Sequence, residues 1–208
     1  MQETAMKTSL VQFLILIIAG TVVTGASAAE SANSIDIGIG GLNPLPHCNV
    51  YVSMIDYEHQ ITPTTTFLVQ GSRINYKYDD GHYLDEGRLK GMDVGARYYP
   101  ASGMRGFFWG GTVGYWNEDR TFTQYQNTPN QWQGKGNNNA FRLNIDIGDR
   151  IPIQGTNISI MPLVSLGKFF FPSSCEVTAP AAQIGNPCSR RPEANYFIFA
   201  GVNAGIVF

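Results

Sequence analysis

The sequence predicts an all-β protein, an eight-stranded antiparallel up-and-down transmembrane β-barrel. Runs of about ten residues with alternating character recur along the chain and are separated by breaks rich in Gly, Pro, Asn and Asp. Only 14% of the 208 residues are charged, whereas 12% are aromatic; soluble domains usually carry about 25% charged residues. After the N-terminal leader, no stretch contains the roughly 20 apolar residues that a spanning helix needs.

The N-terminus has the features of a secretory signal peptide. Lys7 precedes the nearly continuous apolar run Leu10–Gly20, and the small residues at 26–28 (ASA) fit a cleavage site. The apolar run is too short for a spanning helix, which favours cleavage over a permanent anchor. We therefore expect a signal peptide over residues 1–28 and a barrel domain over residues 29–208.

The strands can be counted from the alternating runs. Eight are expected, an even number that returns both ends of the barrel to the same side of the membrane: Ser34–Leu42, Asn49–Gln60, Thr66–Tyr78, Leu89–Tyr99, Gly106–Phe122, Ala140–Ile151, Ile158–Phe171 and Asn195–Phe208. Short breaks alternate with longer ones, as periplasmic turns alternate with extracellular loops. The longer breaks expected outside the cell are His82–Arg88, Thr123–Asn139 and Pro172–Ala194.

The last strand shows the alternation most clearly. Every second residue from Tyr196 to Phe208 is apolar or aromatic, and the other face carries Gly and Asn. Two strands are less regular. In Thr66–Tyr78 an apolar face also carries Arg73 and Lys77, which suggests a bulge near Gly71. In Ile158–Phe171 the pattern does not decide which face meets lipid.

The same alternation turns six charged side chains into the barrel. An isolated charge there is costly, so we expect them to pair across the lumen. Eight strands leave an interior just wide enough for side chains, which favours a plug of ion pairs over a gated ion path. The expected lumenal charge network consists of Asp56, Glu58, Asp93, Arg97, Arg142 and Asp146.

Aromatic residues and one polar loop suggest where the protein meets its surroundings. Tyr, Trp and Phe cluster near strand ends, where they are expected at the membrane interface. The Gln- and Asn-rich loop Thr123–Asn139 carries Tyr125 and Trp132, which we expect to be exposed. Its composition favours a solvated loop; the alternative is a contact site for an extracellular ligand.

The three cysteines suggest one loop disulfide. Cys175 and Cys188 flank a Pro-, Ala- and Ser-rich stretch, and an oxidising exported compartment would favour a bond between them. Cys48 is left over beside His47, and no second pair stands at zinc-ligand spacing, so no metal site is expected.

Catalytic residues are not recognisable in the sequence. The three histidines, His47, His59 and His82, all lack a serine two residues later, so none matches the His-x-Ser that a lipid A deacylase would carry. His82 lies among acidic residues and could belong to a metal or acid–base site, although a solvated acidic loop explains it better. We expect no enzymatic activity, no catalytic or metal site and no cofactor; a lipid-modifying barrel enzyme and a narrow pore remain the alternatives.

One central segment resembles a known family. Gly91–Gly114, with its pattern G-x-R-Y-Y-P … G-F-F-x-G, is similar to the centre of small bacterial outer-membrane β-barrel domains, as are Ile55–Glu58 and the Phe-terminated last strand. The architecture resembles OmpA- and OmpX-type barrels, many of whose relatives have no known function. The resemblance implies a Gram-negative outer membrane and Phe208 as the signal read by the barrel-assembly machinery.

The resemblance and the net charge also limit which partners are expected. We expect outer-membrane lipid and lipopolysaccharide as surroundings and the barrel-assembly machinery as a biogenesis partner. A formal net charge of -2 and the absence of a long basic run argue against nucleic acid.

Overall fold

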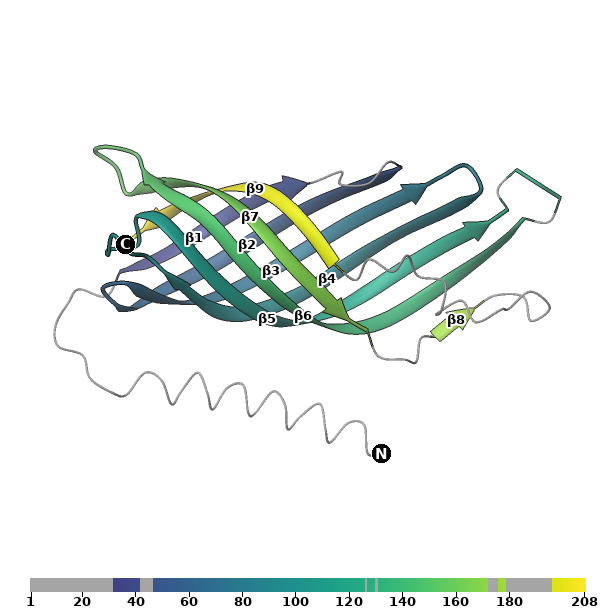
Figure 1. The fold of residues 1–208 in the computed structure, drawn as a ribbon, viewed down its shortest axis with the longest axis horizontal. Coiled ribbons are helices and arrows are strands. Elements are labelled where there is room, and N and C mark those ends of the chain that lie inside the picture. Colours follow the sequence, from purple (N-terminus) through teal and green to yellow (C-terminus); the bar gives the residue numbers. More distant parts are fainter. Residues whose placement is uncertain (1–31, 42–46, 126, 130, 172–175, 179–195) are drawn as a thin grey trace, which may run out of the picture. The chain divides into compact units, whose positions relative to one another are not determined.

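A single antiparallel ring of eight strands forms the described part of the molecule (Figure 1). The computed structural model describes residues 32–41, 47–125, 127–129, 131–171, 176–178 and 196–208. The ring contains β1 to β7 and β9, and it is closed by the pairing of β1 with β9. The strands are β1 (Asn33–Gly41), β2 (Cys48–Thr62), β3 (Thr65–Asp79), β4 (Tyr83–Tyr98), β5 (Gly106–Gln124), β6 (Trp132–Pro152), β7 (Ile158–Phe170), β8 (Glu176–Thr178) and β9 (Tyr196–Val207). The predicted eight-stranded barrel is confirmed.

The two ends of the barrel differ. At one end β1 begins and β9 finishes, held by hydrogen bonds in both directions between the backbones of Asn33 and Phe208, at 2.7 and 2.8 Å. We call this the terminal end; the connections β2–β3, β4–β5 and β6–β7 also lie there. At the opposite hairpin end, the strands β4 to β6 run on well past β1 (Figure 1).

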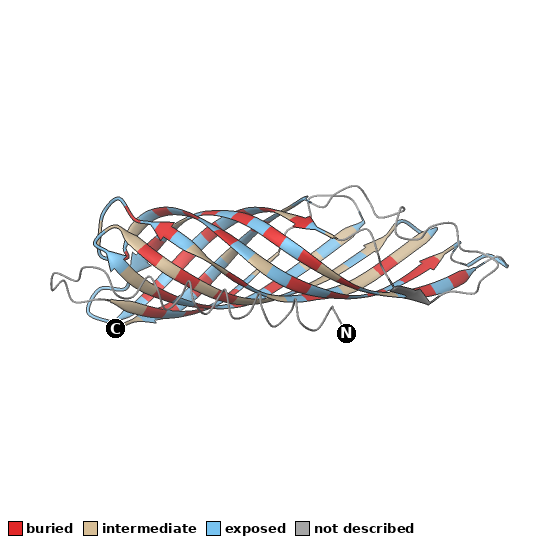
Figure 2. Ribbon diagram, turned by 90° about the horizontal axis from the view of Figure 1, so that it is seen from below, coloured by how far each residue is buried: buried red, intermediate tan, exposed pale blue. Residues whose placement is uncertain are grey.

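Alternate side chains point into and out of the barrel along every long strand, as the bands of buried and exposed residues in Figure 2 show. The predicted bulge near Gly71 is wrong, because β2 and β3 stay in register from Cys48 to Gln60. Arg73 and Lys77 simply lie on the outer face beyond the apolar zone. In β7 the outer face, which the sequence left undecided, carries Ile160, Val164 and Leu166, among others.

The predicted loop His82–Arg88 is wrong in extent, because β4 already begins at Tyr83. A short turn replaces it. The Asp80 carboxylate accepts hydrogen bonds from the backbone N–H groups of His82 (2.9 Å) and Tyr83 (2.6 Å), and Gly81 adopts a positive φ of 84°. An Asp followed by a Gly in this conformation closes a tight hairpin.

The predicted loop Thr123–Asn139 is also too long. β5 and β6 pair continuously from Gly106–Arg150 to Gln124–Trp132, so only residues 125–131 connect them. Tyr125 is exposed as expected, but Trp132 is 7% exposed and packs edge-on against Phe122. Beyond the end of β7, the edge of β6 pairs with the short strand β8, which lies within the predicted loop Pro172–Ala194.

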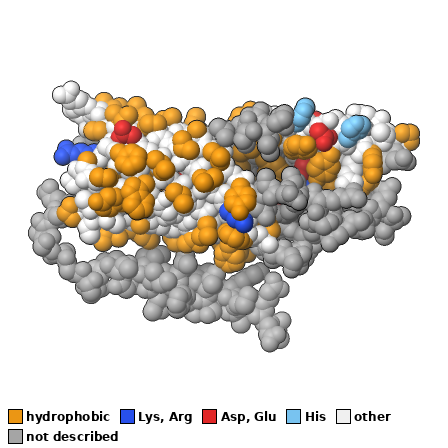
Figure 3. All heavy atoms as spheres, in the orientation of Figure 1, with side chains coloured by type: hydrophobic (Ala, Val, Ile, Leu, Met, Phe, Trp, Pro, Cys, Tyr) orange, Lys and Arg blue, Asp and Glu red, His pale blue; other side chains and the backbone are white. Residues whose placement is uncertain are grey.

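An apolar belt covers the outside of the barrel near the terminal end, and Figure 3 shows part of it in orange. Adjacent aromatic residues divide between the two faces: Tyr98 and Tyr115 point outward, whereas Tyr99 and Trp116 are fully buried inside. The expectation that these aromatics lie at the membrane interface is therefore wrong for those that point inward, such as Tyr99, Trp116 and Phe169. No helix among the described residues is long and apolar enough to cross a membrane.

Inward-facing glycines make room for large rings on the neighbouring strand. Five inner glycines each stand directly opposite an aromatic residue: Gly87–Tyr76, Gly91–Trp116, Gly134–Phe122, Gly148–Phe108 and Gly167–Phe197. A Cβ atom on any of them would come within 2.6 Å of its partner's ring. The glycine-rich composition thus serves the packing of the lumen as well as the turns.

Candidate functional site: the charged lumen

The six charged residues predicted for the lumen all have buried side chains inside the barrel. They come from three strands: Asp56 and Glu58 from β2, Asp93 and Arg97 from β4, and Arg142 and Asp146 from β6. The structure brings them into one network that also includes Asp36 of β1 and Arg150 of β6, which the sequence analysis did not name.

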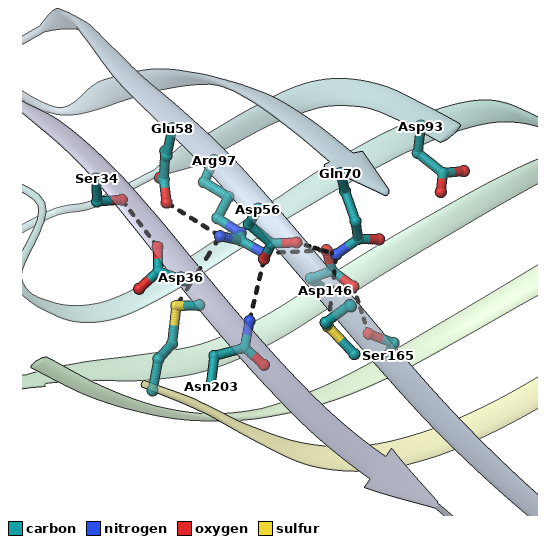
Figure 4. Close-up of polar contacts among 12 residues, drawn as sticks. Ser34, Asp36, Asp56, Glu58, Gln70, Asp93, Arg97, Asp146, Ser165 and Asn203 are labelled. Carbon is teal, nitrogen blue, oxygen red and sulfur yellow. Dashed lines mark hydrogen bonds and ion pairs between the residues drawn. The ribbon is translucent and has the colours of Figure 1, made fainter. Parts of the chain in front are cut away.

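Arg97 lies at the centre of this network (Figure 4). Its Nη1 lies 3.0 Å from Glu58 Oε2 and its Nη2 lies 3.3 Å from Asp56 Oδ2. Asp146 Oδ2 is 3.8 Å from the same Nη2. The guanidinium carbon also sits 5.0 Å from the centre of the Phe108 ring, so one flat cation is held by carboxylates at its edge and by an aromatic face.

Arg150 spans the width of the barrel. Its Nη2 contacts Asp36 Oδ2 at 2.9 Å and Glu58 Oε2 at 2.8 Å. Glu58 belongs to β2, which lies opposite β6 in the ring of eight strands. Arg150 could have been predicted from the sequence. Every second residue of this strand from Arg142 to Arg150 points inward, so Arg150 belongs to the same series as Arg142 and Asp146.

Arg142 holds the network toward the hairpin end. It makes a two-point contact with Asp93, with Nε–Oδ1 at 3.0 Å and Nη2–Oδ2 at 2.7 Å, and it also donates to Gln70 Oε1 at 2.9 Å. Trp116 donates its indole N–H to Asp93 at 3.0 Å, and its ring lies 4.4 Å from the Arg142 guanidinium carbon. Two-point arginine–carboxylate contacts are among the stronger polar interactions in proteins.

Neutral side chains complete the coordination of the carboxylates. Three arginines face five buried carboxylates here, so guanidinium groups alone do not match every acid in number. Gln70 and Asn203 donate to Asp56 at 2.9 and 3.0 Å, and Thr66 donates to Glu58 at 2.5 Å. Ser165 and Asn144 both donate to Asp146. Hydrogen bonds of this kind offset the cost of taking a charge out of water.

An aromatic layer lies next to the charges on the hairpin side. The Trp116 and Phe169 rings meet edge-on at 5.4 Å, and Phe169 contacts Phe197 at 5.2 Å. Phe197 in turn stacks with Phe199 at 6.1 Å. The lumen therefore holds an ion-paired layer and, beside it, an apolar layer.

A second, smaller polar cluster lies beyond this aromatic layer, in the part of the strands that extends past the apolar belt. Arg120 contacts Asp85 at 2.6 Å and the Tyr83 hydroxyl at 2.6 Å. Glu118 accepts hydrogen bonds from Tyr76 (2.9 Å) and Asn138 (2.7 Å). Burial, followed by the charge of Asp85, raises the pKa of Tyr83 to about 12. Burial also raises the pKa of Asp85, against the lowering effect of Arg120.

The three histidines and Cys48 lie apart from the network. His59 contacts Asn33 through Nδ1 at 2.9 Å near the terminal end, and His82 lies in the β3–β4 turn. Within the described residues, no three His, Cys, Asp or Glu side chains are grouped so that they could hold a metal ion. Cys48 opens β2 and is free. The predicted disulfide partners Cys175 and Cys188 lie outside the described residues.

Known structures share this barrel. No protein-family model and no curated protein sequence matches the chain. A major outer membrane protein from Thermus thermophilus is similar with a TM-score of 0.53 and 10% identity, over 85% of this chain and 99% of that one. CarO2 of Acinetobacter baumannii is similar with a TM-score of 0.50 and 12% identity, over 86% of this chain and 100% of that one.

These likenesses establish the fold. The chain has the architecture of small bacterial outer-membrane β-barrels. A closed ring of strands satisfies its own backbone hydrogen bonds, and this ring carries an apolar outer belt, the two properties that let strands cross a membrane. The chain therefore has the fold of an outer-membrane β-barrel.

Proposed function

We propose that this barrel has a structural or surface-interaction role and that its lumen is closed to ions by its own side chains. The contact that carries the proposal is the span from Arg150 to Asp36 and Glu58, because it crosses the barrel between opposite walls. The aromatic layer formed by Trp116 and its neighbours backs this span on the hairpin side. Side chains can fill the interior of an eight-stranded barrel, and the two layers of large side chains support such a filling here.

Conductance across a planar bilayer tests this closure. The refolded protein should leave the bilayer current at its baseline, beside a porin as positive control. A variant carrying Trp116→Ala and Arg142→Ala, which removes one large side chain from each layer, should conduct if it folds. Discrete channels formed by the unaltered protein would favour the narrow pore instead.

We propose no enzymatic activity and no cofactor for the barrel. The arginines and carboxylates of the lumen contact one another, and the turn around His82 uses the Asp80 carboxylate to bind backbone N–H groups. The test is the mass spectrum of lipid A from cells that overproduce the protein and from cells with an empty vector. Identical spectra are expected, and a new acylation state would favour the lipid-modifying alternative.

The surface-interaction part of the proposal concerns the tip of the β5–β6 hairpin. Residues 125–131 lie at the end of the longest strand pair, of 19 and 21 residues, and Tyr125 is 52% exposed there. Replacing the tip by a two-residue turn should abolish binding of cells to an extracellular ligand and leave the barrel folded. Unchanged binding would rule out this hairpin as the contact.

Phe208 is proposed as the signal for the barrel-assembly machinery. Its side chain is 60% exposed on the outer face, next to the closing strand pair. Phe208→Ala should lower the amount of assembled protein in cells, while refolding in detergent stays unchanged. An equal loss of folded protein in cells and in detergent would mean that the Phe208 side chain contributes to barrel stability instead.

A further inference from the structure

A row of polar residues marks where the apolar belt ends on the outer face of β3 to β6. Lys90 stands directly opposite both Arg73 and Asn117, and Asn117 stands opposite Asn139. One step toward the terminal end, the next outward row is Gly71, Met92, Tyr115 and Phe141. The change from aromatic to cationic side chains within a single step places this row at the height of lipid head groups.

The two cations of this row face each other across the strands. Arg73 and Lys90 are direct register partners with exposed side chains. Like charges at directly opposite positions destabilise a strand pair. Arg88 adds a third positive charge, because Arg73 and Arg88 both donate their Nε–H to Asn75 Oδ1, at 3.2 and 3.4 Å.

We define Arg73, Arg88 and Lys90 as the cationic cluster, and no carboxylate stands opposite Arg73 or Lys90 in the strand register. Among the described residues, none forms an ion pair with any of the three. Two acids of the outer face lie near the cluster. Asp119 stands opposite Arg88 in the β4–β5 register but accepts from Asn137 at 3.3 Å, and Glu86 pairs with Lys77 at 3.0 Å. The cluster thus has the composition of an anion site that opens toward the membrane.

A shallow apolar groove adjoins the cluster on its other side. It runs over β9, β1 and β2, where small residues form the floor between larger side chains. The small residues are Gly41, Ser53 and Ala200, and the larger ones are Ile39, Tyr51 and Val202. Asn75 lines the end of this groove and also holds Arg73 and Arg88. An apolar channel that ends at three cations is complementary to a molecule with an acyl chain and an anionic head.

We propose that this surface binds a lipid of the adjacent leaflet whose head group carries phosphate. The phosphate oxygens contact Arg73, Arg88 and Lys90, and one acyl chain lies in the groove beside Ala200. Arginine and lysine near a membrane surface both favour anionic lipid, and the phosphate supplies the charge that the cross-strand pair lacks. This inference rests on the proposed function of the chain as a membrane-embedded barrel and adds to it a specific lipid site.

Native mass spectrometry of the detergent-refolded protein tests the site with diphosphoryl lipid A, its dephosphorylated form and inorganic phosphate as probes. The phosphorylated lipid should bind and the dephosphorylated lipid should bind more weakly. A variant carrying Arg73→Gln, Arg88→Gln and Lys90→Gln should lose affinity about a hundredfold. The matched control, Lys77→Gln with Lys135→Gln, removes outward charges away from the row and should bind as the unaltered protein does.

Each outcome decides a different point. Equal binding of both lipids, or unchanged binding by the triple variant, overturns the phosphate site. Binding of inorganic phosphate as tight as that of the lipid means a free-anion site instead. Ala200→Trp fills the groove, so it should weaken the binding of lipid and leave the binding of inorganic phosphate unchanged. Unchanged lipid binding by this variant overturns the proposal that an acyl chain lies in the groove. Heat-modifiable gel mobility shows whether each variant is folded, and an unaltered protein that fails to insert into vesicles contradicts the proposed membrane role rather than this site.

Discussion

Arginines inside this barrel have carboxylate partners, whereas the arginine at the edge of the outer apolar belt faces another cation. Arg97 lies in the lumen with carboxylates at 3.0 and 3.3 Å, whereas Arg73 lies on the outer face opposite Lys90 without a carboxylate partner among the described residues. Inside, neither water nor lipid head groups can balance a charge, so the chain supplies its own counter-ions. Outside, a charged membrane surface can do so, and the fold leaves the cations open.

The largest effect is expected from Arg97→Gln. The substitution leaves Asp56 and Glu58 buried with part of their partners gone, and breaking a buried pair costs about 3–5 kcal/mol. The midpoint of urea unfolding in detergent micelles, followed by tryptophan fluorescence, should fall accordingly. An unaltered midpoint would mean that the inner network contributes little to stability and that the comparison is wrong.

Overfilling the lumen should have the next largest effect. Gly91→Val places a side chain against the Trp116 ring, where even a Cβ would lie 2.3 Å away, and overpacking costs about 1–3 kcal/mol. The unfolding midpoint should fall and the Trp116 emission should shift. Gly71→Val is the matched control, because that glycine faces outward and its Cβ would meet only Ile55, at 3.4 Å.

A smaller, pH-dependent effect is expected at the hairpin end. Tyr83 has its pKa raised to about 12 in the folded protein, while an unfolded tyrosine ionises near its ordinary pKa of about 10. Its contribution to stability is therefore complete below pH 10 and is lost as the pH rises toward 12. Unfolding midpoints between pH 9 and 12 should fall more steeply for the unaltered protein than for Tyr83→Phe, and parallel curves would contradict this assignment.

The smallest effect, with the opposite sign, is expected from Arg73→Gln. Removing one of two facing cations should raise stability in a neutral detergent by about 0.5 kcal/mol or less. In micelles that contain a phosphorylated lipid this gain should disappear, because the cation then has a partner. A loss of stability in neutral detergent would show that Arg73 makes a favourable contact that the repulsion does not cancel.

Alternation in the sequence was enough to predict the fold and the six inward charges, because strand side chains point to opposite faces with a period of two. It could not reveal which charges meet, since Arg150 reaches Glu58 across the barrel and not along a strand. It also failed beyond the belt. There the outer face turns polar, so Arg73 suggested a bulge and residues 132–139 suggested a loop, although both lie in regular strands.

The same contrast explains why the lipid site is hard to see in a sequence. Arg73, Arg88 and Lys90 are common surface residues, and only the β3–β4 register brings Arg73 and Lys90 face to face. Asn75 joins them to the groove, whose walls come from both ends of the chain through the β1–β9 closure.

The central claim is that charges in the lumen are balanced by the protein and charges at the belt edge by the membrane. The most direct test compares the unfolding midpoints of Arg97→Gln and Arg73→Gln in neutral detergent and in the same detergent with diphosphoryl lipid A. The account predicts that Arg97→Gln lowers the unfolding midpoint strongly in both media. It also predicts that the lipid raises the midpoint of the unaltered protein and that this rise is smaller in Arg73→Gln. An Arg97→Gln midpoint equal to that of the unaltered protein, or an identical lipid response in both variants, would contradict it.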